Sequence, residues 1–247
     1  MSGTVPSEVP GSGPGKAGPK RGPVRGRRRL CDPFKFDRGL LNEQATAPGS
    51  PDLRLAGADE AGRGSLAGPL VAAAVVLDYA RSPFPLLKGL TDSKLLSPHA
   101  REEMYEGVLL SASYVSWSAY CPETIDRVGL HRCNLSALAG VLESLGDGYT
   151  FAVVDGFDLE RGDLRARSIV GADYKSAVVA AASVVAKVVR DRLMKTLASA
   201  YPEYGFDEHV GYATGRHQEA LRLHGPCSLH RRSFRGVDTV QLGLWDE

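Results

Sequence analysis

The chain of 247 residues contains no long apolar run. A membrane-spanning helix needs about 20 consecutive apolar residues, and no segment approaches that length, so we expect no association with a membrane. The N-terminal stretch MSGTVPSEVPGSGPGKAGPK has no apolar core of the kind that a secretory signal requires. The sequence therefore predicts a cytoplasmic protein.

Cysteine is scarce as well. The four cysteines, Cys31, Cys121, Cys133 and Cys227, lie far apart and form no C-x-x-C pair. This spacing argues against a zinc ribbon and against a disulfide framework, and it is typical of reduced thiols. The six histidines show no H-E-x-x-H spacing, and no segment has the G-x-x-x-x-G-K-[ST] order of a nucleotide-binding loop.

The charges balance overall but are unevenly distributed. The chain has 30 Lys and Arg against 29 Asp and Glu, yet residues 1–29 hold seven of the basic residues and a single acid. Residues 1–50 are also rich in Gly, Pro and Ser, so we expect a disordered basic tail. Two interpretations remain open: an arm that adds nonspecific attraction to phosphates, or a dispensable extension.

The remainder of the chain, residues 51–247, predicts one α/β domain. Hydrophobic residues make up 43% of the whole chain, which is ordinary for a globular protein. Apolar runs and helical spacing predict strands at 53–58, 69–77, 114–120, 151–154 and 168–170, and helices from Ser97-Pro98 and at 130–145, 174–198 and 217–223.

Carboxylates follow three of the predicted strands. Asp59, Asp155 and Asp173 each come after an apolar run, and Glu60 lies beside the first. If the strands are neighbours, these side chains converge, and their mutual repulsion calls for divalent cations with oxygen ligands, above all Mg²⁺ or Mn²⁺. The alternative is that each acid is a turn residue or a helix cap, with Asp173 capping the long helix.

Small residues surround an arginine directly after these acids. Gly62, Arg63 and Gly64 would let a nucleic-acid backbone approach closely, with the guanidinium group forked onto a phosphate. A tight turn without a ligand explains the same three residues. The sequence alone leaves both interpretations open.

An ordered set of short motifs carries a resemblance to a known family. The motifs are D-E-A-G-R-G at 59–64, T-D-S-K at 91–94, V-D-G at 154–156, Asp173, A-A-A-S, A-K-V and R-D between 180 and 191, G-Y-A-T at 211–214, and H-R-R-S-F at 230–234. Over about residues 53–237, the chain resembles ribonuclease HII, the bacterial type 2 ribonuclease H.

The resemblance implies a ribonuclease H-like fold, with a mixed central sheet flanked by helices and a helical C-terminal portion from about residue 200. It implies hydrolysis of the RNA strand of RNA–DNA hybrids and nicking 5′ of single ribonucleotides in duplex DNA, with 3′-hydroxyl and 5′-phosphate products. It also implies two Mn²⁺ or Mg²⁺ ions per active site. The expected state is a monomer, and protein partners remain unassigned.

The resemblance also assigns roles by position. Asp59, Glu60, Asp155 and Asp173 take the places of the metal-binding catalytic carboxylates. The residues in substrate-binding positions are Gly62, Arg63, Gly64, Lys94, Ser183 and Tyr212, where Tyr212 would pack against the deoxyribose after the ribonucleotide. A tyrosine that packs on the sheet is the alternative for Tyr212.

Three positions depart from the family pattern. Leu95, Gly171 and Val210 stand where lysines are common, which predicts weaker attraction to phosphate unless the basic tail compensates.

Two rival assignments are weighed against this resemblance. Ribonuclease HIII is disfavoured because it has an additional ordered N-terminal domain, and a nonenzymatic nucleic-acid-binding protein is disfavoured because unscreened carboxylates would repel phosphates.

Overall fold

The computed structural model describes residues 32–44 and 53–237. A five-stranded mixed sheet with the strand order β3-β2-β1-β4-β5 forms its centre. The strands are β1 Arg54–Ala61, β2 Leu70–Asp78, β3 Tyr114–Tyr120, β4 Phe151–Asp155 and β5 Ala166–Ile169. β2 is antiparallel to both β1 and β3, whereas β1, β4 and β5 run parallel.

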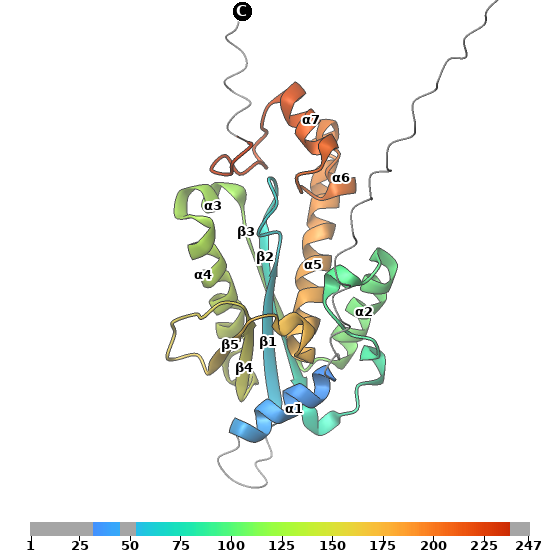
Figure 1. Ribbon diagram of the computed structural model, residues 1–247, viewed down its shortest axis with the longest axis vertical. Helices are drawn as coiled ribbons and strands as arrows, with labels where there is room; N and C mark the ends of the chain where they lie inside the picture. The colour runs from blue at the N-terminus through green and yellow to red at the C-terminus, as the bar shows by residue number, and fades with distance from the viewer. Residues whose placement is uncertain (1–31, 45–52, 238–247) are drawn as a thin grey trace, which may run out of the picture.

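Helices cover both faces of this sheet (Figure 1). Their bounds are α1 Pro33–Gln44, α2 Pro98–Ser111, α3 Pro122–Val128, α4 Leu130–Glu143, α5 Ala177–Ala198, α6 Phe206–His209 and α7 Gly215–His224. α4 lies on one face, and α5 lies on the other with α2 beside it, while α6 packs beside the C-terminal part of α5 and α7 lies beyond it. The predicted mixed sheet with flanking helices is confirmed.

The sheet is buried on both faces, which explains its continuous apolar strands. Every residue of β2 except Asp78 is buried, as an internal strand covered on both sides requires. Small side chains of α5, among them Ala177, Ala180, Ala181 and Ala182, are buried in the core cluster between this helix and the sheet. No helix in the described ranges is long and apolar enough to cross a membrane.

The ends of two elements differ from the sequence-based expectation. β1 continues to Ala61, so Asp59 and Glu60 lie inside the strand rather than after it. The long helix begins at Ala177, and its N-cap is Ser176, whose hydroxyl accepts from the Val179 amide at 3.4 Å. Asp173 is therefore not the cap of this helix.

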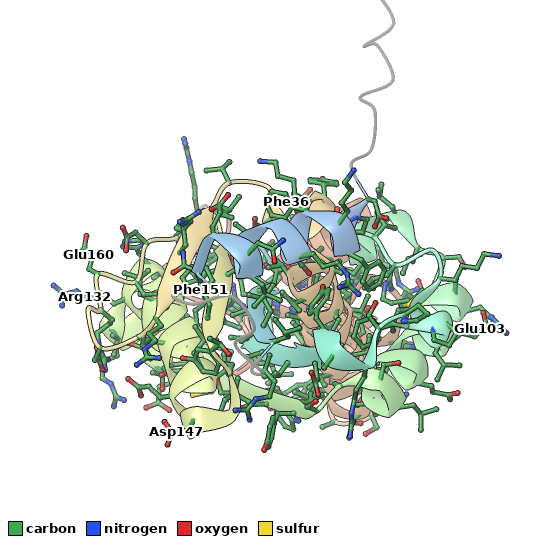
Figure 2. All side chains as sticks on the ribbon, turned by 90° about the horizontal axis from the view of Figure 1, so that it is seen from below. Phe36, Glu103, Arg132, Asp147, Phe151 and Glu160 are labelled. Carbon is green, nitrogen blue, oxygen red and sulfur yellow. The ribbon has the colours of Figure 1, made fainter. Side chains whose placement is uncertain are left out.

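Helix α1 corrects the prediction that residues 1–50 are disordered throughout. Residues 33–44 form a helix whose Asp37, Leu40 and Leu41 are buried, and this helix crosses the end of the molecule at which Phe151 begins β4 (Figure 2). The sequence pattern of residues 33–44 did not predict this helix, because contacts with residues distant in the chain stabilise it. The rest of the predicted tail, at 1–31 and 45–50, lies outside the described residues.

The main distant contact of α1 is made by the Asp37 carboxylate. Asp37 Oδ2 accepts from the Val178 amide at 3.0 Å, at the start of α5, and from the Tyr79 hydroxyl at 2.5 Å. Burial raises the pKa of Asp37 to about 6, against the lowering effect of these hydrogen bonds. An aspartate of α1 thus supports the first turn of the longest helix.

We expect Asp37→Asn to flatten the dependence of stability on pH. Because the folded-state pKa of Asp37 is raised, ionisation costs the wild-type protein stability as the pH rises towards and through 6. The free energy of unfolding of the wild type, relative to Asp37→Asn, should fall by about 2 kcal/mol between pH 4 and pH 8. Urea denaturation at several pH values measures this difference.

Asp37→Ala provides the matched comparison. It removes the acceptor and leaves the Val178 amide and the Tyr79 hydroxyl unpaired, which should cost about 1–3 kcal/mol at every pH. Parallel pH profiles for the wild type and Asp37→Asn would contradict the assigned titration.

Candidate active site

Two carboxylates lie side by side where the parallel pairing of β1 with β4 ends. The register pairs Ala58 with Val154, which places Asp59 and Asp155 side by side at the next position. Parallel strands lie about 4.8 Å apart, and paired residues point to the same face. That face is covered by α5, because Leu55 of β1 and Phe151 of β4, which share the parity of the two acids, pack in the core cluster beneath this helix.

Asp59 is almost completely buried, with 5% of its surface exposed. Its Oδ1 accepts from the Glu60 amide at 2.8 Å. Burial raises the pKa of Asp59 well above its usual range, the charges of Glu60 and Asp155 raise it further, and the Ser183 hydroxyl of α5 opposes the shift. Such a carboxylate is costly to ionise unless a cation lies beside it.

Glu60 points to the other face of β1, because side chains alternate along a strand. Asn134 of α4 is its neighbour there, and Glu60 Oε2 is buried without a hydrogen-bond donor. Burial raises the pKa of Glu60 to about 7, with Asp155 adding to the shift and Arg63 opposing it.

The position of Asp173 depends on a hydrogen bond of Asp155. Asp155 Oδ1 accepts from the Ala172 amide at 2.7 Å, at the start of the short 3₁₀ turn η5 Ala172–Tyr174. This bond fixes the turn that presents Asp173, whose Oδ1 is buried without a donor. Burial raises the pKa of Asp173 to about 6, followed by the charges of Asp155 and Asp92.

Asp92 is a fifth carboxylate that the sequence interpretation did not assign. It is 1% exposed, and its Oδ2 has no donor, while its Oδ1 accepts from the Lys94 amide at 3.0 Å. The Lys94 ammonium group lies 3.7 Å from Asp173 Oδ2 and 3.9 Å from Asp92 Oδ1. The position of Asp92 inside the T-D-S-K motif is the signal that could have identified it.

The acids are neighbours, but they do not form a closed cage. Among the described residues, no three or more His, Cys, Asp or Glu side chains are gathered closely enough to hold a metal ion as they stand. Asp59 and Glu60 leave β1 on opposite faces, so the set is divided around the strand. The unpaired oxygens of Glu60, Asp92 and Asp173 nevertheless fit a divalent ion, because hard cations take carboxylate oxygens as ligands.

The glycine-arginine segment follows β1 directly. Gly62 is buried with φ +84°, whereas Arg63 and Gly64 are exposed. The Arg63 guanidinium group lies 5.0 Å from the centre of the Phe157 ring, in the loop after β4. The charge of Arg63 also opposes the rise in the pKa of Glu60, so this exposed arginine lies close to the acids.

Tyr212 lies next to this segment. Gly211 O accepts from the amides of Leu66 and Ala67, at 2.9 and 3.2 Å, which joins the two segments. The Tyr212 ring is half-buried against α5, with the Lys187 ammonium and the Arg190 guanidinium groups each 5.3 Å from its centre. The ring therefore contacts two cations of α5.

The two remaining predicted site residues lie beside the acids. Ser183 of α5 is 3% exposed, and its hydroxyl is 2.8 Å from that of Ser93, next to Lys94. Lys94 is exposed apart from its two carboxylate neighbours. Among the three departures from the family pattern, Leu95 is exposed, and Gly171 and Val210 adopt left-handed conformations with φ +66° and +45°.

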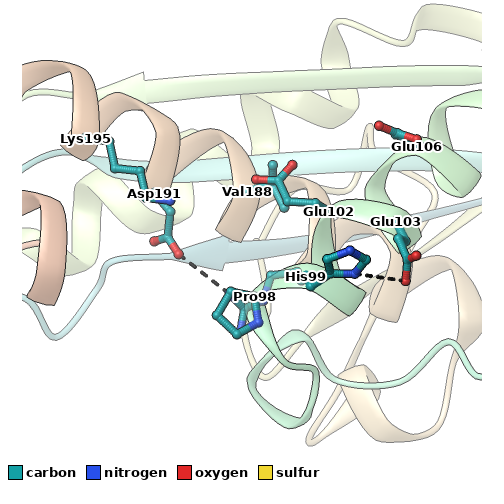
Figure 3. Close-up of a pocket in the computed structure, with 9 residues that line it drawn as sticks. Pro98, His99, Glu102, Glu103, Glu106, Val188, Asp191 and Lys195 are labelled. Carbon is teal, nitrogen blue, oxygen red and sulfur yellow. Dashed lines mark ion pairs between the residues drawn. The ribbon is translucent and has the colours of Figure 1, made fainter.

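A groove between α2 and α5 is separate from this site (Figure 3). It has a volume of about 370 Å³, and its ion pairs are His99–Glu103 at 3.4 Å and Arg101–Asp191 at 3.7 Å. None of the predicted site residues lines it. Asp191 also pairs with Lys187 at 2.7 Å.

Solved structures identify the class of fold. The crystal structure of ribonuclease H2 from Pyrococcus horikoshii OT3 has a TM-score of 0.67 at 26% identity, over 76% of this chain and 97% of that one. The crystal structure of Bst-RNase HIII in complex with Mn²⁺ has a TM-score of 0.59 at 19% identity, over 76% of this chain and 69% of that one. At this identity the similarity shows only a common fold. The mixed sheet and its helices therefore define a ribonuclease H-like protein.

The family follows from closer relatives. The family model of ribonuclease HII matches residues 56–237. A ribonuclease HII of Xanthobacter autotrophicus is 50% identical over 191 residues, which cover 77% of this chain and 75% of that protein. The chain belongs to the ribonuclease HII family, whose members are divalent-metal-dependent endonucleases that hydrolyse RNA in RNA–DNA hybrids.

Proposed function

We propose that the protein, besides cleaving RNA–DNA hybrids, nicks duplex DNA on the 5′ side of a single ribonucleotide, with two divalent ions held by Asp59, Glu60, Asp155 and Asp173. The observation that carries the proposal is the acidic edge itself. Buried carboxylates with raised pKa values and oxygens without donors are destabilising on their own and are compensated by cations.

The ions supply the hydrolytic chemistry in this proposal. When bound, a pair of divalent ions lowers the pKa of a water molecule and stabilises the negative charge on the departing 3′ oxygen, giving 3′-hydroxyl and 5′-phosphate ends. The carboxylates of the protein would hold the two ions, and neighbouring residues orient these carboxylates. Asp155 fixes the turn that presents Asp173, and Ser183 donates to Asp59, so two different elements aim carboxylates at one region.

Selection for a ribonucleotide requires a contact with its 2′-hydroxyl, the group by which RNA differs from DNA at a given site. The backbone of Gly62, Arg63 and Gly64 lies directly beyond Glu60, close to the acids. Tyr212 lies on the adjoining segment, where its ring can pack against the next sugar. A ribose at that position would clash, so this pair of contacts favours a ribonucleotide followed by a deoxyribonucleotide.

The test uses a labelled DNA duplex with one embedded ribonucleotide, incubated with Mn²⁺, the ion that accompanies the ribonuclease HIII structure of the same fold. We expect a single cut 5′ of the ribonucleotide, with ends that a ligase and a phosphatase identify as 3′-hydroxyl and 5′-phosphate. An all-DNA duplex of the same sequence is the control. Cleavage of continuous hybrids without cleavage of this duplex would overturn the proposal.

A further inference from the structure

Arg190 is one of two arginines, with Arg231, that have no exposed surface in the described residues. It lies in the middle of α5, and its guanidinium group donates to four oxygen atoms of neutral groups. The contacts are Nε to Pro69 O at 3.0 Å, Nη1 to Val210 O at 2.9 Å, and Nη2 to Ser65 Oγ at 2.8 Å and Ala67 O at 3.1 Å. Burial lowers the pKa of Arg190.

These acceptors belong to two segments that have separate roles in the proposed function. Ser65, Ala67 and Pro69 follow Gly62–Gly64, whereas Val210 precedes Tyr212. Ser65 also donates to Gly62 O at 2.9 Å, which extends the contact of Arg190 to the start of the glycine-arginine segment. The same guanidinium group lies 5.3 Å from the centre of the Tyr212 ring.

The backbone fits closely around this group. A Cβ atom on Gly62 would lie 1.8 Å from Arg190 Nε, so the segment is in direct contact with the Arg190 side chain. A Cβ atom on Gly211 would lie 2.3 Å from Ala67 O, so the two segments also touch each other. Val210 holds a left-handed conformation, φ +45°, which is costly for a β-branched residue and persists only where other contacts enforce it.

We infer that Arg190 is a positioning residue that fixes the distance between Gly62–Gly64 and Tyr212, and so couples recognition of the ribose 2′-hydroxyl to recognition of the sugar that follows. The inference rests on the proposed function. One rigid, planar group that binds both segments holds them in a single arrangement before substrate arrives. A lysine at the same place keeps a positive charge but lacks the planar fork of donors.

A second buried arginine provides a comparison. Arg231 is also fully buried, and it donates to Gly68 O, at 3.1 and 2.9 Å, and to Arg63 O at 2.9 Å. These contacts reach the glycine-arginine segment but not the segment of Tyr212. Arg231→Lys should therefore weaken cleavage of every ribonucleotide-containing substrate to a similar extent.

The test compares kcat/KM on two substrates, a duplex with one ribonucleotide and a continuous RNA–DNA hybrid. For Arg190→Lys we expect a loss of about 100-fold on the first substrate and about tenfold or less on the second, because a displacement of about 1 Å in a positioned group costs up to about 100-fold. Arg192→Lys, at an exposed position on the same helix that pairs with Glu102, should change neither value.

A merely structural role predicts a different pattern. Loss of folded protein lowers both rates in proportion and leaves their ratio within twofold of the wild type, and that result would overturn the inference. Thermal denaturation establishes whether Arg190→Lys is folded. If it is not, Ser65→Ala, which removes one acceptor of Arg190, should shift the ratio in the same direction by a few fold, and an unchanged ratio there counts against the inference equally.

The two proposals fail in distinguishable ways. If the wild type cleaves hybrids but not the single-ribonucleotide duplex, the proposed function is wrong and the coupling falls with it. If the wild type cleaves both and the ratio is unchanged in the Arg190 and Ser65 variants, the proposed function stands and the coupling is wrong.

Discussion

Asp59→Asn should lower kcat on an RNA–DNA hybrid by about 1000-fold or more and change KM only a few fold. A bound divalent ion contributes several kcal/mol of charge stabilisation to the transition state, and about 4 kcal/mol corresponds to a factor of about 1000 in rate. Asp59 has two acidic neighbours, Glu60 along the strand and Asp155 on the adjacent strand β4. Removing its charge therefore affects the whole site.

The same substitution should stabilise the protein in the absence of metal. Burial and the charges of Glu60 and Asp155 raise the pKa of Asp59, so its ionised form weakens the fold. We expect a higher thermal midpoint for metal-free Asp59→Asn than for the wild type, and a smaller rise of that midpoint when Mn²⁺ is added. This second readout is independent of turnover.

Asp163→Asn is the matched control. Asp163 is exposed, lies in the loop between β4 and β5, and pairs with Arg161 at 2.7 Å. The change in side-chain chemistry is identical, but we expect kcat and the response to Mn²⁺ to remain those of the wild type. A turnover of Asp59→Asn within tenfold of the wild type would refute a metal-binding role for Asp59.

The sequence predicted the elements whose patterns are local. β3 occupies 114–120 as its alternation indicated, and the continuous apolar run of strand length at 69–77 corresponds to the buried strand β2. Helix α2 begins at Pro98 with Ser97 as its cap. Helix α1 could not be predicted in this way, because the contact that stabilises it joins Asp37 to Val178, far away in the chain.

The candidate site was predictable one residue at a time but not as an arrangement. Asp59 and Glu60 stand out as acids next to an apolar run, yet their division between the α5 and α4 faces depends on which helix covers which face. Asn134 is fully buried beside Glu60 and was overlooked. It is a polar residue in the apolar stripe of α4, one turn before Leu138, and that position is the signal that could have revealed it.

The close approach of α5 to β1 depends on Gly57. A Cβ atom at this position would lie 2.2 Å from the Val178 carbonyl carbon and 2.4 Å from the Val179 amide nitrogen. Both atoms are backbone, and they belong to the first turn of a helix held by Asp37 and Ser176. The helix therefore cannot accommodate a methyl group by a change of rotamer and has to move away from the sheet.

Gly57→Ala should accordingly destabilise the protein by about 3 kcal/mol or more, at the upper end of the usual cost of overpacking. Gly140→Ala, in α4, introduces the same methyl group where nothing lies within 4 Å, and should stabilise by about 1 kcal/mol because alanine is the better helix former. Urea denaturation of the two variants should thus give changes of opposite sign.

Moving α5 also displaces Ser183 from Asp59, so the folded fraction of Gly57→Ala should cleave hybrids more slowly than the wild type. Equal stability of Gly57→Ala and the wild type would mean that α5 does not lie on β1 as closely as described.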